Sequence, residues 1–403
     1  MLDLIEVLRM DGTILRHGDT SPTGRAGVVV YISPSSPPMY EHERATLCTN
    51  GRTIARLSGC EYGGIHGDGH RGCAGLFFVP DEALVLDEAA PLGIRGESDL
   101  FGGVVPSAFV GTKAISHELI EDCADRPAGW STAFAKAAGE VALPGYTVFR
   151  AGDARHAAER LLALGSVRLK RSVSCGGGGQ QAAANLAEVD AFLEKLSPDE
   201  LTTYGLVLET NLRDVTTYSI GRISIAGTHV TYYGTQRVAI DNEGHPVYGG
   251  SDLVCLRGDW DVLDRIALTS EIRLAAVQAR QYDGATAAYP GFIATRRNYD
   301  VAQGVDDRGR ARSGVLEASW RSGGATTAEL AALELLRGDP ELQLVEARAA
   351  KQFGARAEPP RGAVVHFAAD DPRDGPILRY TLVTRVAPCP PSPCLAATAG
   401  AEP

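Results

Sequence analysis

The sequence predicts an α/β protein with more than one domain. Short apolar segments typical of strands alternate with segments whose apolar residues recur at helical spacing. The chain has 403 residues, 44% of them hydrophobic, which is enough to bury a sizeable core and indicates two or three domains or lobes. Between residues 167 and 324, lysine, glycine and acidic residues follow strand-like segments in an order that indicates a ligand site.

The first lobe is expected to be a small α/β domain over residues 1–125. Residues 26–33 (AGVVVYIS) form a continuous apolar run typical of a buried strand. The segments 75–80 (GLFFVP) and 104–111 (VVPSAFVG) have the same character. Proline and glycine make residues 122–130 a linker candidate between this domain and the next.

A glycine-rich segment of this domain holds side chains that zinc accepts: Cys60, His66, Asp68, His70 and Cys73. Their spacing matches no common zinc module. We therefore expect a loop at the surface or at an active site, with His66 or His70 touching a substrate.

The second lobe is expected over residues 126–205. Apolar residues at helical spacing predict one helix over 153–164, with Asp153 as its cap, and another over 186–196. Both helices would pack around the short strand at 167–170 (VRLK).

The third lobe is expected over residues 206–386. Strands predominate up to residue 270, and helices are predicted over 271–289 and 326–336. Thr326 and Glu329 have the spacing of a capping box at the start of the last helix.

Composition and chain ends exclude several classes of function. The formal net charge of −11 argues against general binding to nucleic acids or anionic membranes. The first residues lack the pattern of a signal peptide, and no stretch reaches membrane-spanning length, so we expect a cytoplasmic protein. The eight cysteines are scattered, as is typical of buried thiols, and the Pro-rich tail at 387–403 is predicted to be disordered.

Two carboxylates indicate a metal site. Asp300 ends one apolar run and Glu317 the next, with turn-forming residues between them, so the two acids are expected on adjacent strands. Neighbouring carboxylates repel each other, and a divalent cation is the commonest compensation. The alternative is a solvated hairpin, which would leave Arg321, Gly323 and Gly324 without a role.

Two other segments have features of a nucleotide site. Lys170 leaves its strand just before the glycine run 176–179, whose N–H groups could face phosphate oxygens, although the run could equally be a flexible turn. It is not a Walker A loop, because no Gly-Lys-Ser/Thr follows it. The apolar strand at 206–210 then reaches the acid Glu209, where an adenine could lie, although an ordinary strand edge would look the same.

The order of these three segments resembles the ATP-grasp superfamily over about residues 110–340. The chain is more closely similar to an uncharacterised bacterial ATP-grasp-like family known only as a domain of unknown function. The segments that carry this likeness are GTKAISH, LPGYTVF, VRLK, GLVLETNL, YYGTQR, VYGGSDL, RRNYDVAQG and SGVLEASWRSGGAT. The resemblance implies an ATP-grasp fold: a Rossmann-like N-terminal domain followed by two ATP-binding lobes.

The resemblance also implies nucleotide-binding residues. Lys170 would contact the α- and β-phosphates of ATP, with Lys113 as a second phosphate lysine. The glycine loop would close over the phosphates; it consists of Gly176, Gly177, Gly178 and Gly179. The adenine would lie between Leu208 and Leu212.

Further roles follow for the acids and arginines. Glu209 or Asp214 would hold the ribose. Asp300 and Glu317 would bind Mg²⁺, with Mn²⁺ as an alternative, and Arg321 would lie near the transferred phosphoryl group.

Two positions depart from the superfamily pattern. Ser319 replaces an asparagine that usually completes the metal site, and its hydroxyl could still bind the cation or a ligating water. Asn298 stands where arginine is common, and the adjacent Arg296 or Arg297 could supply the missing charge.

The implied activity is an ATP-dependent ligase that joins a carboxylate to an amine or a thiol through an acyl phosphate. Its partners would be small molecules, and a homodimer is expected by similarity. A small-molecule kinase and a nucleotide-binding regulatory protein without turnover remain as alternatives.

Overall fold

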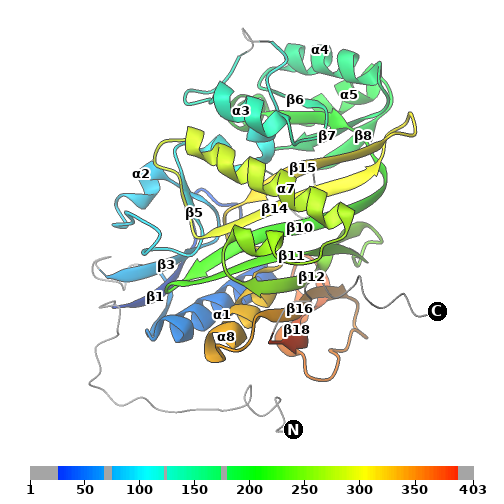
Figure 1. Ribbon diagram of the computed structural model, residues 1–403. Coiled ribbons are helices and arrows are strands. Elements are labelled where there is room, and N and C mark those ends of the chain that lie inside the picture. The colour runs from blue at the N-terminus through cyan, green and yellow to red at the C-terminus, as the bar shows by residue number, and fades with distance from the viewer. Residues whose placement is uncertain (1–25, 68–74, 122–124, 174–178, 389–403) are drawn as a thin grey trace, which may run out of the picture.

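The computed structural model describes residues 26–67, 75–121, 125–173 and 179–388. It is a mixed α/β protein, as predicted, and its described residues form one parallel sheet near the N-terminus, one small mixed sheet and two antiparallel sheets (Figure 1). Residues 389–403 of the expected disordered tail and most of the glycine loop lie outside the described residues, as do Asp68, His70 and Cys73, whereas Ala387 belongs to a strand and not to a disordered tail.

The N-terminal layer is a three-stranded parallel sheet in the order β2-β1-β3. Its strands are β1 (Gly27–Tyr31), β2 (Tyr62–Ile65) and β3 (Leu76–Pro80). Helix α1 (Glu41–Ser58) connects β1 to β2 and ends at Gly59, whose φ of 64° suits a left-handed cap. The valines of β1 are fully buried, which explains the continuous apolar run in the sequence.

A second small sheet pairs two short strands of the N-terminal region with a strand that comes much later in the sequence. It has the order β13-β5-β4, with strands β4 (Leu84–Val85), β5 (Gly103–Val105) and β13 (Ile293–Ala294), and the short helix α2 (Leu86–Ala89) follows β4. Two 3₁₀ turns, Ala108–Gly111 and Lys113–Ser116, then lead toward the next lobe.

The smaller antiparallel sheet has the order β6-β9-β7-β8. Its strands are β6 (Gly145–Val148), β7 (Val167–Arg171), β8 (Gln180–Ala183) and β9 (Leu206–Thr210). The helices of this region are α3 (Thr132–Gly139), α4 (Ala151–Leu162), α5 (Leu186–Leu193) and α6 (Pro198–Tyr204). Strand β9 was expected to open the third lobe, but it pairs with β6 and β7 and is therefore internal to this sheet.

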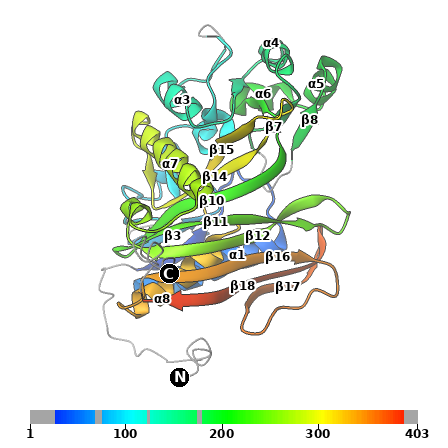
Figure 2. The same cartoon turned by 45° about the vertical axis from the view of Figure 1, so that its right-hand side comes forward.

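The larger sheet is antiparallel and eight-stranded, in the order β15-β14-β10-β11-β12-β16-β18-β17. Its strands are β10 (Arg213–Ile225), β11 (Thr228–Ile240), β12 (Pro246–Arg257), β14 (Arg296–Val305), β15 (Ala311–Ser319), β16 (Leu344–Phe353), β17 (Val364–Asp371) and β18 (Gly375–Ala387). Figure 2 shows β15 on the side of the smaller sheet and β17 at the opposite edge.

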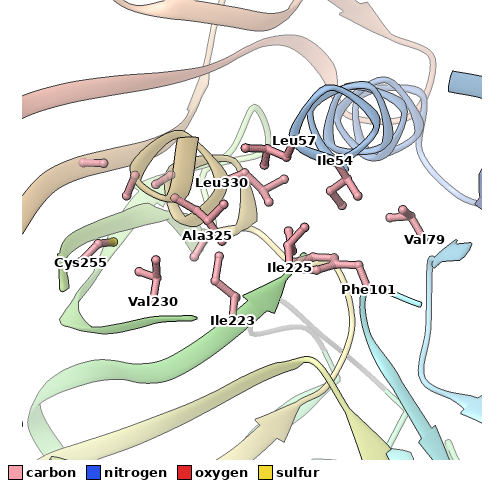
Figure 3. Close-up of a cluster of buried hydrophobic side chains, with 14 of the residues drawn as sticks. Ile54, Leu57, Val79, Phe101, Ile223, Ile225, Val230, Cys255, Ala325 and Leu330 are labelled. Carbon is pink, nitrogen blue, oxygen red and sulfur yellow. The ribbon is translucent and has the colours of Figure 1, made fainter. Parts of the chain in front are cut away.

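Helices cover both faces of this sheet. Helix α7 (Ser270–Ala285) packs on one face through its alanines and Tyr282. Helix α8 (Thr326–Gly338) lies with α1 on the other face, where they form the largest buried cluster. In Figure 3, Ile54 of α1 and Leu330 of α8 point toward one another near Ile223 and Ile225 of β10.

Two predicted helix starts are wrong. Asp153 lies inside α4, which begins at Ala151. Thr326 and Glu329 do not form a capping box, because the Thr326 hydroxyl accepts a hydrogen bond from the Gly323 N–H at 2.9 Å and Glu329 faces the sheet, where it binds an arginine. The glutamate at this spacing is therefore part of the interior.

The packing of α8 leads to a stability prediction. Leu330 is 1% exposed in the cluster between α1, α8 and the sheet, whereas Leu274 on α7 is 46% exposed. We expect Leu330→Ala to lower the free energy of unfolding by about 2–5 kcal/mol, because it leaves a cavity in a packed core. Leu274→Ala is the matched control and should cost less than about 1 kcal/mol. Equal losses in chemical denaturation would contradict this packing.

Candidate functional site

The two predicted metal-site acids lie side by side on the large sheet. Strands β14 and β15 pair as the antiparallel neighbours that the sequence predicted, and Asp300 is the register partner of Glu317. A register shift follows directly after this pair. The two carboxylates come from the face of the sheet that also carries Arg296 and Asn298, on the side of α8.

Asp300 is held by polar neighbours that the sequence did not identify. Its Oδ1 accepts hydrogen bonds from Asn298 Nδ2 at 2.9 Å and Ser219 Oγ at 3.2 Å. Burial, and then the negative charge of Glu317, raise the pKa of the Asp300 carboxyl to about 6. The negative charge of Asp300 is therefore disfavoured both by burial and by the neighbouring carboxylate.

Glu317 is ionised by contrast. Burial opposes its ionisation, but the ammonium group of Lys113 outweighs burial and lowers the pKa of Glu317. The Lys113 Nζ lies 2.8 Å from Glu317 Oε2. The charges of Lys170 and Arg321 act on Glu317 in the same direction.

The strand-end lysine of the smaller sheet is paired with a buried acid. Lys170 Nζ lies 2.5 Å from Glu209 Oε1, and His117 Nε2 lies 3.3 Å from the other oxygen of the same carboxylate. Burial opposes ionisation, yet the lysine charge and the histidine hydrogen bond lower the pKa of Glu209 to about 2. Glu209 is 1% exposed, so it is a buried partner of Lys170 and not an acid available to a ribose.

One short segment reaches both carboxylates. Lys113 begins the 3₁₀ turn 113–116 and contacts Glu317, while His117 follows the same turn and contacts Glu209. This turn therefore connects the acid of the large sheet with the acid of the smaller sheet.

The remaining predicted nucleotide residues are dispersed. Gly176, Gly177 and Gly178 lie outside the described residues, and Gly179 has a φ of 65° just before β8.

The hydrophobic and acidic residues expected around the base lie in different surroundings. Leu208 is fully buried in the core of the smaller sheet. Leu212 packs in a separate small cluster with Leu143 and Ala302. Asp214 is exposed, with a φ of 52° on the first residues of β10.

The arginines near the acid pair have separate roles. Arg296 binds Glu329 through two hydrogen bonds of 2.8 and 2.7 Å, and its Nη1 donates to the Ser319 hydroxyl at 3.3 Å. Arg321 pairs with Glu82 at 2.8 Å.

Arg297, expected as one source of positive charge beside the acid pair, lies on the other face of the sheet. As the next residue along β14 it points to the opposite face, where its Nη1 lies 2.9 Å from Asp283 and its guanidinium stacks over Phe292. It is therefore bound between α7 and the sheet, away from Asp300.

Two other features are absent from the described residues. No group of three or more His, Cys, Asp or Glu side chains is placed to hold a metal ion in the described part of the chain. Among the helices that the structure describes, none is long and apolar enough to cross a membrane.

A comparison with protein families decides the relationship of this chain. The model of the family described as "Protein of unknown function (DUF3182)" matches residues 30–381. The chain belongs to the DUF3182 family. This confirms the expected kinship with a family known only as a domain of unknown function, and no curated protein matches the DUF3182 chain.

Solved structures resemble the DUF3182 chain at low identity. N5-carboxyaminoimidazole synthetase from Staphylococcus aureus, in complex with ADP, is 11% identical, with 90% of this chain and 94% of that chain covered and a TM-score of 0.46. Biotin carboxylase from Campylobacter jejuni is 11% identical, with 88% and 87% covered and a TM-score of 0.47. D-alanyl-alanine synthetase A from Vibrio cholerae is 10% identical, with 76% and 93% covered and a TM-score of 0.44. These likenesses carry no conclusion about ligands or chemistry.

The Lys170–Glu209 contact leads to a pH-dependent prediction. A carboxyl whose pKa is lowered on folding stabilises the protein above its unfolded pKa, near 4.5, and loses that contribution as the pH falls toward 2. We expect Glu209→Gln to lower the free energy of unfolding by about 2–4 kcal/mol at pH 7 and by progressively less below pH 4.5.

Chemical denaturation between pH 3 and pH 8 would measure this difference. Glu243→Gln is the control, because that side chain is 79% exposed and should change stability little at any pH. A Glu209→Gln effect that stays constant with pH would argue against the ion pair.

Proposed function

We propose that this chain binds ATP with Mg²⁺ and joins a small-molecule carboxylate to an amine or a thiol. The observation that supports the proposal is the convergence of cations on one acid pair. Lys113, Lys170 and Arg321 all lower the pKa of Glu317, and they come from three separate segments of the chain. Such a convergence of positive charge beside paired carboxylates suits a polyphosphate and its metal ion.

The acid pair suits a divalent cation. Asp300 has a raised pKa because burial and Glu317 disfavour its negative charge, and a bound cation would remove that penalty. Mg²⁺ usually takes one or two carboxylates together with substrate phosphates and water. Asp300 and Glu317 would hold it, and the ion would neutralise charge between the β- and γ-phosphates.

In this proposal the protein contributes charge and alignment. The substrate carboxylate attacks the γ-phosphorus of ATP, the bond to the β-phosphate oxygen breaks, and an acyl phosphate and ADP form. The amine then attacks the acyl carbon, loses a proton and releases phosphate. Lys170 and Lys113 would bind phosphate oxygens, and no side-chain nucleophile is required.

Two ion pairs in the described structure would have to be replaced by contacts to phosphate when ATP binds. Lys170 is bound to Glu209 and Lys113 to Glu317, so phosphate oxygens would compete with carboxylates for both ammonium groups. The Ser319 hydroxyl is engaged by Arg296, which favours a cation held by the two acids with water in the remaining positions.

Calorimetric titration of ATP tests the nucleotide site. We expect Mg²⁺-dependent binding to wild type that is weakened at least about tenfold in Glu317→Ala and in Lys170→Met, because each change removes a charged contact to metal or phosphate. Glu243→Ala, at a side chain that is 79% exposed, should bind like wild type. Equal affinity in all four proteins, or no binding to wild type, would refute the proposal.

Phosphate release separates the reactions that such a site could catalyse. A ligase releases phosphate only when an acid and an amine or thiol are present together. Release of ADP with a phosphorylated hydroxyl compound would identify a kinase, and nucleotide binding without turnover would identify a regulatory protein.

A further inference from the structure

A second charged cluster lies on the same face of the large sheet, on β16 and β18, which are four and five strands from β14. Arg379 on β18 and Lys351 on β16 are direct register partners. Residues 345, 347 and 349 of β16 belong to the core under α1 and α8, so Lys351 continues that face by strand alternation. Both cations therefore face the side on which Asp300 lies.

Arg379 has no carboxylate within ion-pair distance among the described residues. Its Nη1 donates to His42 Nδ1 at 3.2 Å, and burial lowers the pKa of its guanidinium. The same imidazole contacts Asp374 through Nε2 at 3.3 Å. Burial, then the charges of Arg379 and Lys351, lower the pKa of His42 to about 4, so this histidine is neutral at pH 7 and does not add charge.

The acids around the cluster have other partners. Asp374 lies between His42 and Lys351, at 3.4 Å from the ammonium group. Asp371 accepts hydrogen bonds from the backbone N–H groups of His42 and Arg373, which fixes the start of α1. Glu43 acts on Arg379 only through its charge. The guanidinium thus remains the least compensated charge of the cluster.

Within the described structure, His366 has a ring nitrogen without a hydrogen-bond partner and is affected by the charge of Arg379. His366 on β17 contacts the Thr381 hydroxyl through Nε2 at 2.8 Å, and its Nδ1 is buried without a hydrogen-bond partner. Burial, and then Arg379, lower the pKa of His366 to about 4. In the tautomer whose Nε2 accepts from Thr381, Nδ1 carries a hydrogen that can be donated to an anion.

Tyr248 links this cluster to the acid pair. Its hydroxyl lies 2.8 Å from Ser251 Oγ, and the charges of both Asp300 and Arg379 act on it. A Cβ on Gly324 would lie 2.3 Å from the Tyr248 ring, so the start of α8 reaches the same place. Tyr248 of β12 therefore lies between the acids of β14 and β15 and the basic residues of β16 and β18 in the order of the sheet.

We propose that Arg379 and Lys351 bind an anionic group, a carboxylate or a phosphate, on the second substrate. The inference rests on the proposed ligase function and adds the class of substrate to it. The site would bind an oxyanion through three donor groups. These are the guanidinium of Arg379, which has no acid partner among the described residues, the ammonium group of Lys351 and the unused N–H of His366. The reacting end of the substrate then extends along the sheet toward Asp300 and Glu317.

The test uses the simplest anions and no nucleotide. The full chain is titrated calorimetrically with sodium phosphate, and separately with sodium acetate, in EDTA and at low chloride. We expect saturable binding that weakens at least about tenfold in Arg379→Met, while Arg379→Lys keeps most of the affinity because it keeps the charge. Arg385→Met is the matched control, since Arg385 lies on the same strand, is 55% exposed and pairs with Glu346.

A variant of the nucleotide site separates the two proposals. Lys170→Met should bind both small anions like wild type, although it binds ATP poorly. Anion binding that is lost in Lys170→Met but kept in Arg379→Met would place the anion at the nucleotide site and overturn this inference. Absence of saturable binding to wild type would overturn it as well.

A comparison of phosphate with acetate also identifies the anionic group of the substrate. Phosphate binding without acetate binding supports a phosphorylated substrate, and acetate binding supports a carboxylate. Thermal unfolding of Arg379→Met shows whether the variant is folded, and Arg379→Lys provides an independent result if it is not.

Discussion

A buried ion pair between Arg296 and Glu329 holds the parts of this protein together. Both side chains are almost fully buried, at 1% and 0% exposure, and they join β14 to α8. Arg296 also donates to the carbonyl oxygens of Ser319 and Arg321, at 3.2 and 2.6 Å, and so fixes the chain where β15 ends. Removing one member of such a pair leaves a buried charge and typically costs about 3–5 kcal/mol.

Successive side chains of β14 point to opposite faces of the large sheet and have different roles on each face. Arg296, Asn298 and Asp300 face α8, and the amide of Asn298 orients the carboxylate of Asp300. Arg297 and Tyr299 face α7, and both bind Asp283. Two adjacent arginines thus have different functions, because successive side chains of a strand point to opposite faces. Asp300 can be ordered because β14, the strand that carries it, is fixed on both faces.

Local features of the site could be predicted from the sequence, whereas long-range partners could not. The hairpin that pairs Asp300 with Glu317 follows from two apolar runs separated by turn residues, and the structure has it. The partner of Arg296 lies 33 residues away, and its spacing from Thr326 suggested a helix cap. The apolar residues of α8 indicate its buried face, but no local pattern indicates that Glu329 lies on that face with a distant arginine as its partner.

The same limit applies to the smaller sheet. The strand before Lys170 and the strand that contains Glu209 were both predicted, but their ion pair was not, since β9 was expected in another lobe. His117 gave no signal, because a single histidine after a turn has many equivalent explanations. A helical pattern of apolar residues did predict α4, α5, α7 and α8, with errors of a few residues at their ends.

The core under α1 has a consequence for how the chain folds during synthesis. That core combines residues of α1 and β1 with Leu330 of α8 and Val345 of β16, and β5 is completed by β13. The backbone of His42 at the start of α1 is bound by Asp371, 329 residues later. Residues of α1 and β1 are therefore translated before the elements that cover them. Until α8 and β16 have also been translated, their apolar surface is exposed, and exposed apolar surface of this kind favours aggregation during folding.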